Sequence, residues 1–269
     1  MSARGTSLVR RAFPEEPPFD RIIAAFTTRR PNDTRAPFGS SNTGLHTGDD
    51  PISVLENRRV IFAELGLDPD SLTAAKQVHG ENIARVTTSQ RGMGALCYDN
   101  AIPATDALIT DVPNIPLGIF TADCVPVFLY DPAKTAVGVI HAGWRSTVRE
   151  ITFKTVQRMT QEFGANPRDI WAAIGPSIGP CCYEVGEDVL SAFGASFQYA
   201  SSLFQKTATQ KWHLDLWLAN FLQLRDCGLQ ETRIIRLGIC SACNCHEYFS
   251  ARKQGSRTGR TLSLIAIKQ

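Results

Sequence analysis

Three short segments each place a possible metal ligand where an apolar run gives way to turn residues. The ligands are His79 in Lys-Gln-Val-His-Gly, Cys124 in Thr-Ala-Asp-Cys-Val-Pro, and His141 in His-Ala-Gly-Trp-Arg. Because side chains at strand ends often converge at one edge of a sheet, the three can meet. One thiolate and two imidazoles suit Zn²⁺ and leave a fourth tetrahedral position open. The spacing is equally compatible with a half-buried cysteine and two hydrogen-bonded histidines without a metal.

An open zinc site of this kind is typical of enzymes. The ion lowers the pKa of a bound water to about 7, which provides a nucleophile at neutral pH. Cys124 and His141 are therefore also candidate catalytic residues. Asp123 is the nearest carboxylate in sequence and the candidate general acid or base, although its alternation with Cys124 favours opposite directions.

A second set of residues, next to His141, is suited to an anion. Gly143 allows a tight turn, and Ser146 can cap a following helix whose free N–H groups attract phosphate or carboxylate. Arg145 can add a bidentate contact to the same anion, or it can be an ordinary surface residue.

The other cysteines fall into two groups. Cys240, Cys243, Cys245 and His246 form a CxxCxCH pattern that can be counted as a second metal site, although seven residues is a strained span for four ligands. The neighbouring Cys181 and Cys182 follow a loop rich in Gly and Pro and are interpreted as packed thiols rather than a redox device.

These residues need a scaffold, and the pattern predicts many strands and a few helices. Strands are expected over 22–27, 72–78, 83–88, 106–110, 115–121, 125–130, 135–141, 170–174, 232–237 and 261–267, with a turn at His79 and Gly80 joining the second and third. Helices are expected over 51–65, 146–163, 184–193 and 214–224. Many strands are joined as hairpins, so a mixed α/β (α+β) architecture is favoured over a doubly wound parallel sheet.

Composition excludes several classes of protein. The 269 residues carry a net charge of +2, which is too weak to indicate nucleic-acid binding. No apolar run is long enough to span a membrane, and the polar, Pro-rich residues 1–20 do not resemble a signal peptide and are expected to be flexible. We therefore expect a cytoplasmic protein with reduced cysteines and a single domain over 21–269.

Taken together, these motifs resemble the laccase-domain family, first described as multicopper polyphenol oxidases and later as purine nucleoside phosphorylases, which also includes peptidoglycan editing factor-like proteins. The matching stretches are Gly48-Asp-Asp, Glu56-Asn-Arg-Arg, Gln77-Val-His-Gly, Thr121-Ala-Asp-Cys-Val-Pro, His141-Ala-Gly-Trp-Arg, Ile174-Gly-Pro-Ser-Ile-Gly-Pro-Cys-Cys-Tyr-Glu-Val, Phe249-Ser and Thr258-Gly-Arg. They occur in order from about Phe26 to Ile267.

The resemblance implies a single domain of layered β-sheets flanked by helices, with one zinc ion on His79, Cys124 and His141. It also implies phosphorolysis of adenosine, inosine and methylthioadenosine, with adenosine deamination as a second activity. The partners are then small molecules, a nucleoside and phosphate. Candidate contacts to the sugar, base or phosphate are Asn42, His46, Arg58, Gln77 and Arg145. The oligomeric state is not indicated.

Two other activities stay open. A copper polyphenol oxidase with several copper centres needs on the order of ten imidazole ligands, and this chain has five histidines, although Cu²⁺ can occupy the zinc ligands. A cysteine-dependent amidase that edits cell-wall precursors would use Cys124 as nucleophile and His141 or His79 as its base.

Overall fold

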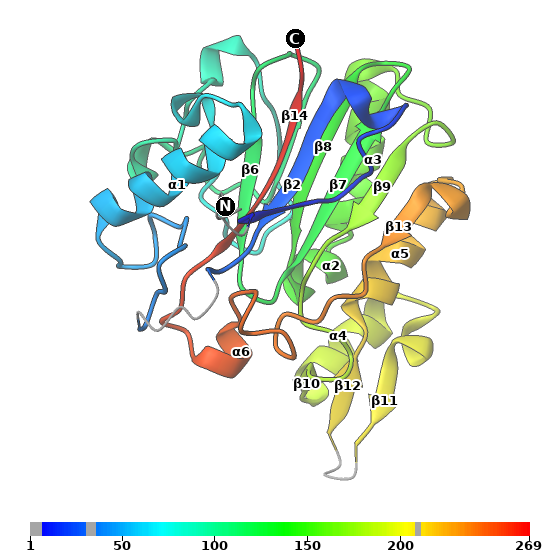
Figure 1. The fold of residues 1–269 in the computed structure, drawn as a ribbon. Coiled ribbons are helices and arrows are strands. Elements are labelled where there is room, and N and C mark those ends of the chain that lie inside the picture. The colour runs from blue at the N-terminus through cyan, green and yellow to red at the C-terminus, as the bar shows by residue number, and fades with distance from the viewer. Residues whose placement is uncertain (1–6, 31–35, 208–210) are drawn as a thin grey trace.

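The computed structural model describes residues 7–30, 36–207 and 211–269. Within these residues, two β-sheets pack face to face and helices cover their outer faces (Figure 1). The prediction of a mixed α/β domain with layered sheets is confirmed. No helix in the described ranges is both long and apolar enough to cross a membrane.

The first sheet has five strands in the order β1-β2-β14-β6-β3. All neighbours are antiparallel except β3 and β6, which are parallel. The strands are β1 (Val9–Arg11), β2 (Ile22–Thr27), β14 (Thr261–Ile267), β6 (Leu117–Thr121) and β3 (Thr73–Ala74).

The second sheet has six strands in the order β13-β9-β7-β8-β5-β4. The pairs at its two edges, β13 with β9 and β4 with β5, are parallel, and the central pairs are antiparallel. The strands are β13 (Ile234–Arg236), β9 (Trp171–Ile174), β7 (Val125–Asp131), β8 (Ala136–Ala142), β5 (Ala107–Thr110) and β4 (Ile83–Arg85).

A small third sheet and six α-helices complete the part of the fold that residues 7–30, 36–207 and 211–269 describe. The sheet has the order β10 (Glu184–Val185), β12 (Trp212–Leu214), β11 (Phe204–Lys206). The helices are α1 (Pro51–Leu65), α2 (Trp144–Val148), α3 (Ile151–Phe163), α4 (Glu187–Ser196), α5 (Leu216–Asp226) and α6 (Ala251–Gln254). Single 3₁₀ turns are found at Phe19–Arg21, Pro69–Ser71, Thr88–Gln90, Tyr98–Asn100, Ala200–Leu203 and Glu231–Arg233.

The apolar core is divided into three slabs by the two large sheets. One slab lies between the sheets, where Ile119 of β6 and Ile265 of β14 belong to the same cluster as Phe128 of β7. A second slab packs the other face of the six-stranded sheet against α3 and α5. The third packs the five-stranded sheet against α1. Burial of apolar area on both faces of each sheet is the main favourable term holding the layers together.

Helix α1 forms where the sequence predicts it. The Asp50 side chain accepts hydrogen bonds from the backbone N–H groups of Ile52 and Ser53, and Pro51 occupies the first turn. The helix ends at Gly66, whose φ of 68° is the left-handed conformation that glycine adopts readily.

The predicted hairpin around His79 and Gly80 is wrong. β3 pairs with β6 in the five-stranded sheet, whereas β4 pairs with β5 in the six-stranded sheet, so the chain crosses between sheets instead of turning back on itself. Alternating apolar residues mark both strands but do not reveal which sheet each one joins. The crossover carries His79, at a φ of 57°.

Three further expectations need correction. The helix expected over 146–163 is broken at Glu150, whose φ of 59° makes it the N-cap of α3. The first of the two helices, α2, also begins earlier than expected, with Gly143 rather than Ser146 as its N-cap. The helix expected from position 184 begins only at Glu187, because the preceding residues pair as β10. Residues 7–20 are not a free segment either, since β1 pairs with β2 and Phe19 is buried. Residues 1–6 lie outside the described ranges.

Candidate metal centre

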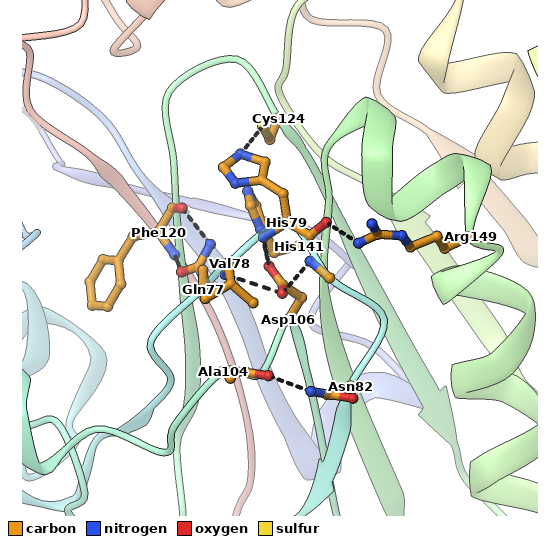
Figure 2. A network of polar contacts seen from close by, with 11 residues as sticks. Gln77, Val78, His79, Asn82, Ala104, Asp106, Phe120, Cys124, His141 and Arg149 are labelled. Carbon is orange, nitrogen blue, oxygen red and sulfur yellow. Dashed lines mark hydrogen bonds and ion pairs between the residues drawn. The ribbon is translucent and has the colours of Figure 1, made fainter. Parts of the chain in front are cut away.

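His79, Cys124 and His141 meet at one end of the two large sheets, although three different parts of the chain provide them (Figure 2). His79 lies on the crossover after β3, Cys124 lies between β6 and β7, and His141 lies near the end of β8. The Cys124 Sγ lies 3.7 Å from His79 Nε2, and the two imidazole rings are 4.8 Å apart. The three ligand atoms all lie within 4.8 Å of one another.

Asp106, which the sequence reasoning did not single out, orients both histidines. Its fully buried carboxylate accepts hydrogen bonds from the backbone N–H groups of Val78, His79 and Gly80, at 3.2, 3.0 and 2.7 Å. It also lies 2.8 Å from His141 Nδ1, which donates because a carboxylate can only accept. That bond leaves Nε2 of His141 to face the other two ligands, an arrangement common for metal-binding histidines.

Charge is concentrated at this centre. Burial would raise the pKa of Asp106, but the His141 hydrogen bond and charge and the N–H donors outweigh it and hold the pKa below its usual value. Burial also disfavours the charged forms of Cys124 and His141. The attraction between a Cys124 thiolate and a His141 imidazolium outweighs this effect. The pKa of Cys124 is lowered by His141 and His79, and the pKa of His141 is raised by Cys124 and Asp106. The arrangement therefore favours a Cys124 thiolate beside a His141 imidazolium.

The geometry of the three ligands fits a tetrahedral metal ion. With bonds of about 2.3 Å to sulfur and 2.0–2.1 Å to nitrogen, such an ion holds sulfur and nitrogen roughly 3.6 Å apart. The observed 3.7 Å between Cys124 Sγ and His79 Nε2 agrees with this spacing. The backbone of Gly143 packs directly against two of the ligands, and a side chain at this position would collide with them. A Cβ there would lie 2.7 Å from His79 Cδ2 and 3.2 Å from Cys124 Sγ.

The three ligands form part of the wall of a cavity of about 510 Å³, within the size range of small-molecule sites. The wall combines aromatic rings, imidazoles, a carboxylate and two guanidinium groups. The lining residues are His46, Gln77, His79, Phe120, Thr121, Ala122, Asp123, Cys124, His141, Ile178, Tyr183, Ala251, Arg252, Ser256 and Arg260.

Two of the five predicted substrate contacts lie on this wall. Gln77 also stabilises the backbone of the cavity wall. Its side-chain amide donates to the carbonyl of Phe120 at 2.9 Å and accepts from the N–H of Phe120 at 2.8 Å. His46 packs its ring 5.8 Å from the ring of Phe120. Desolvation by its surroundings and the charges of Arg260 and Arg58 hold the pKa of His46 below its usual value, so its ring is neutral at pH 7.

The other three predicted contacts do not line the cavity. Arg58 is buried and donates to the carbonyls of Thr43, Gly94 and Ala95, which makes it a structural cross-link. Arg145 is exposed and stacks on Trp144, 4.3 Å from the ring centroid.

Asn42 is also buried, and its side chain binds backbone and neighbouring side chains. Its Oδ1 accepts from the N–H of Gly44 and from the N–H of Arg260, and its amide donates to Thr47 and Asp49. Asn42 therefore supports Arg260, which does reach the cavity.

The sequence reasoning missed the two arginines of the cavity wall. Arg260 precedes β14, and its Nη1 donates to the carbonyls of Thr258 and Gly259, at 2.6 and 3.0 Å. Arg252 belongs to α6 and lies over the ring of Tyr183, 5.2 Å from its centroid. The signals available for Arg260 were its place in the matching stretch Thr258-Gly-Arg and immediately before a buried strand.

Asp123 also lines the cavity, but its carboxylate is engaged. Oδ1 accepts from the Ser241 hydroxyl and Oδ2 from the N–H of Arg252, both at 2.7 Å. Its φ of 98° is strained for a residue other than glycine. The carboxylate thus joins the turn that holds Cys124 to the segment that holds Arg252.

The chain is similar to several known proteins over nearly its whole length. Residues 23–268 match a family described as multi-copper polyphenol oxidoreductase laccase. The chain is 40% identical over 248 residues to purine nucleoside phosphorylase YlmD of Bacillus subtilis, covering 92% of this chain and 89% of the relative. It is 37% identical over 248 residues to adenosine deaminase RL5 of an unknown prokaryotic organism, covering 92% and 94%. The crystal structure of YlmD from Geobacillus stearothermophilus aligns with a TM-score of 0.90 at 35% identity, covering 97% of this chain and 100% of the other.

Proposed function

The chain belongs to the multi-copper polyphenol oxidoreductase laccase family and is 40% identical to a relative named purine nucleoside phosphorylase, and we propose that it cleaves purine nucleosides with phosphate. The proposal includes adenosine deamination as a second activity, as in the relative named for it. The observation that carries it is a nucleoside-sized cavity in which His79, Cys124 and His141 face two arginines.

Different residues of the cavity wall are suited to different parts of the substrates. Phe120 and Tyr183 offer aromatic surface for a purine base. Arg260 and Arg252 provide the positive charge that phosphate needs, and the neutral ring of His46 can hydrogen-bond to a hydroxyl or phosphate. In our proposal these groups replace Arg145, Arg58 and Asn42 as the direct substrate contacts.

In phosphorolysis, a phosphate oxygen forms a bond to C1′ of the ribose while the bond from C1′ to N9 breaks. The purine leaves with the bonding electron pair. We assign Arg260 and Arg252 to orient the phosphate, and Asp123 to position Arg252 through its backbone N–H. Asp123 is then a positioning residue in place of the general acid or base first expected.

We propose Zn²⁺ as the metal on His79, Cys124 and His141, because one thiolate and two imidazoles at this spacing suit it. When bound, the ion provides Lewis-acid catalysis. Asp106 keeps the proton of His141 on Nδ1, which leaves Nε2 free to bind the metal. The eight cysteines are all unpaired, in keeping with the reducing cytoplasm where we place the activity.

A cysteine-dependent amidase is the second candidate, and one observation favours it. Cys124, His141 and Asp106 follow each other as nucleophile, base and orienting carboxylate do in cysteine hydrolases, and the pKa of Cys124 is lowered. A covalent acyl-enzyme on Cys124 would support this activity, whereas protection of Cys124 from alkylation by Zn²⁺ would support the metal site.

A multicopper oxidase is not favoured. His213 and His246 join neither of the two groups of possible metal ligands within the described residues, and His46 is not a member of them either. Copper at the three-ligand site remains chemically feasible, and metal analysis of protein produced without added copper distinguishes it from zinc.

The decisive assay incubates the purified protein with inosine and phosphate and measures hypoxanthine and ribose-1-phosphate. We expect the two products in equal amounts, and their loss in Cys124→Ala. Adenosine is tested in parallel for ammonia release. Absence of products from the wild type, or full activity in Cys124→Ala, would refute the proposal.

A further inference from the structure

Four cysteines outside the catalytic cavity form a second cluster. Cys181 and Cys182 follow β9, and Cys240 and Cys243 follow β13. These two strands are parallel neighbours at the edge of the six-stranded sheet, and a further bridge joins Ser177 to Cys240. The two loops therefore leave the sheet side by side, which brings together thiols about sixty positions apart in the sequence.

The set differs from the one the sequence suggested. Cys245 and His246 are not among the four residues, and their places are taken by Cys181 and Cys182. Four ligands drawn from two loops avoid the strain expected of four ligands within seven residues. This supports the cluster as a site for a single ion.

The sulfur spacing fits a metal ion better than disulfides. The Cys243 Sγ lies 3.4 Å from Cys182 Sγ and 3.5 Å from Cys181 Sγ, and all four sulfurs lie within 4.8 Å of one another. A disulfide needs about 2.05 Å between sulfurs. A tetrahedral ion with four bonds of about 2.3 Å holds its sulfurs roughly 3.8 Å apart.

The backbone around the cluster favours a thiolate at Cys240. The N–H of Gly179 donates to Cys240 Sγ at 3.3 Å. Cys240 is buried among Ile178, Ala242 and the ring of Trp217. Hydrogen bonds to ligand atoms from outside the coordination sphere orient the ligands of metal sites.

We propose that Cys181, Cys182, Cys240 and Cys243 bind one Zn²⁺ ion as a closed tetrathiolate site with a structural role. Each thiol releases its proton to solvent as its bond to the ion forms, so binding is coupled to pH. Four protein ligands leave no position for water or substrate, which separates this site from the three-ligand site of the cavity.

The position of the cluster gives the ion a function. Ile178 and Tyr183, from the loop that holds the first two cysteines, line the cavity. The N–H of Ile178 donates to the carbonyl of Asp123 at 2.8 Å, and Arg252 Nη1 donates to the carbonyl of Cys182 at 3.3 Å. The ion would therefore tie the loop that lines the cavity through Ile178 and Tyr183 to the loop whose Ser241 donates to Asp123 of the cavity wall.

The test counts metal in the purified protein by mass spectrometry and determines its ligands by X-ray absorption. We expect about two zinc equivalents per chain in the wild type, and about one in Cys243→Ser. In Cys124→Ala, which loses the cavity site, the remaining zinc should show only sulfur neighbours, at about 2.3 Å. Cys245→Ser is the matched control, two positions from Cys243 and outside the cluster, and it should keep the wild-type content.

Three results would overturn the proposal. They are an unchanged zinc content in Cys243→Ser, nitrogen or oxygen neighbours around the zinc of Cys124→Ala, and iron in place of zinc. If Cys243→Ser does not fold, the wild type decides the question, because titrating its thiols with an organomercurial should release about two zinc equivalents per chain. The same titration of Cys124→Ala should release about one zinc equivalent. Release of none from that variant, or disulfides among the four cysteines in the mass spectrum, would contradict the site. Because each variant removes one site, failure here is distinguishable from failure of the catalytic metal.

Discussion

Asp106 holds His141 in the tautomer that a metal ligand requires: its Oδ1 lies 2.8 Å from His141 Nδ1, and both groups are buried. The same carboxylate accepts the N–H groups of three successive residues around His79. One buried charge thus fixes the two imidazoles of the candidate site, one through its ring and the other through its backbone.

Asp106→Asn should weaken metal binding by roughly ten- to a hundredfold, the effect usual for partners of metal-binding histidines. An amide presents only one acceptor oxygen. Either His141 and the N–H of His79, which Oδ1 accepts, or the N–H groups of Val78 and Gly80, which Oδ2 accepts, therefore lose their acceptor. Competition against a chelator of known affinity measures the change. Asp111→Asn, at the other end of β5 and bound to Arg85, is the control and should leave affinity unchanged. Equal affinities in the two variants would contradict the role of Asp106.

Gly143→Ala should also impair the metal site, because the added methyl group would lie 2.7 Å from His79 Cδ2. The backbone of Gly143, at a φ of −71°, accepts alanine without strain, so the protein should remain folded. Metal content and thermal unfolding are measured together. The matched change Gly194→Ala, in α4 with open space around it, should keep the metal and raise stability by about 0.4–1 kcal/mol. Full metal content in Gly143→Ala would show that the site tolerates displacement of His79.

The pH dependence of Cys124 alkylation tests the thiolate directly. Because the pKa of Cys124 is lowered, the thiolate should persist to lower pH than in an ordinary thiol, whose pKa is about 8.5. In metal-free protein, the rate of reaction with iodoacetamide, followed by peptide mass spectrometry, should reach half its maximum well below that pH. Added Zn²⁺ should protect the thiol. A midpoint at or above the ordinary value would rule out the pairing of Cys124 with His141.

Arg260→Gln should raise the KM for phosphate by roughly ten- to a hundredfold, as expected for loss of a hydrogen bond between charged groups of about 1.5–3 kcal/mol. Arg145→Gln should leave that KM unchanged, because Arg145 stacks on Trp144 away from the cavity wall. Initial rates at varied phosphate concentration measure both. A raised KM for phosphate in Arg145→Gln and an unchanged KM in Arg260→Gln would contradict this assignment. It would instead support the anion site first expected beside α2.

Arg58→Met should act on stability rather than on KM. The change leaves buried carbonyls of Thr43, Gly94 and Ala95 without their donor, at about 1–3 kcal/mol for each group not recovered by water. Urea unfolding should show a loss of several kcal/mol, while the KM values at a temperature where the variant is folded stay near those of the wild type. A raised KM with unchanged stability would place Arg58 in the substrate site.

The sequence predicts the elements well where the signal is local. Helix α1 has its N-cap, first-turn proline and terminal glycine within the chain segment itself, and β14 is rich in apolar residues and buried along its whole length. His79, Cys124 and His141 were recognisable because each stands where an apolar run gives way to turn residues.

Residues whose role depends on distant partners were not predictable in the same way. Nothing near Arg58 in sequence indicates that its guanidinium reaches carbonyls 36 and 37 positions away. In the sequence, Asp106 is an ordinary polar residue before a strand. Its role depends on the crossover, which brings the N–H groups of three residues to its carboxylate. Cys181 and Cys182 join Cys240 and Cys243 only because β9 and β13 are parallel neighbours, a pairing that the hydrophobic pattern does not encode.

Phosphate-dependent cleavage of inosine by metal-depleted protein, before and after return of Zn²⁺, tests the central claim most directly. We predict that depletion abolishes the release of hypoxanthine and ribose-1-phosphate, and that Zn²⁺ restores it in the wild type but not in Cys124→Ala. Undiminished cleavage by the depleted protein, or no cleavage by the zinc-loaded protein, would contradict a zinc-dependent nucleoside phosphorylase.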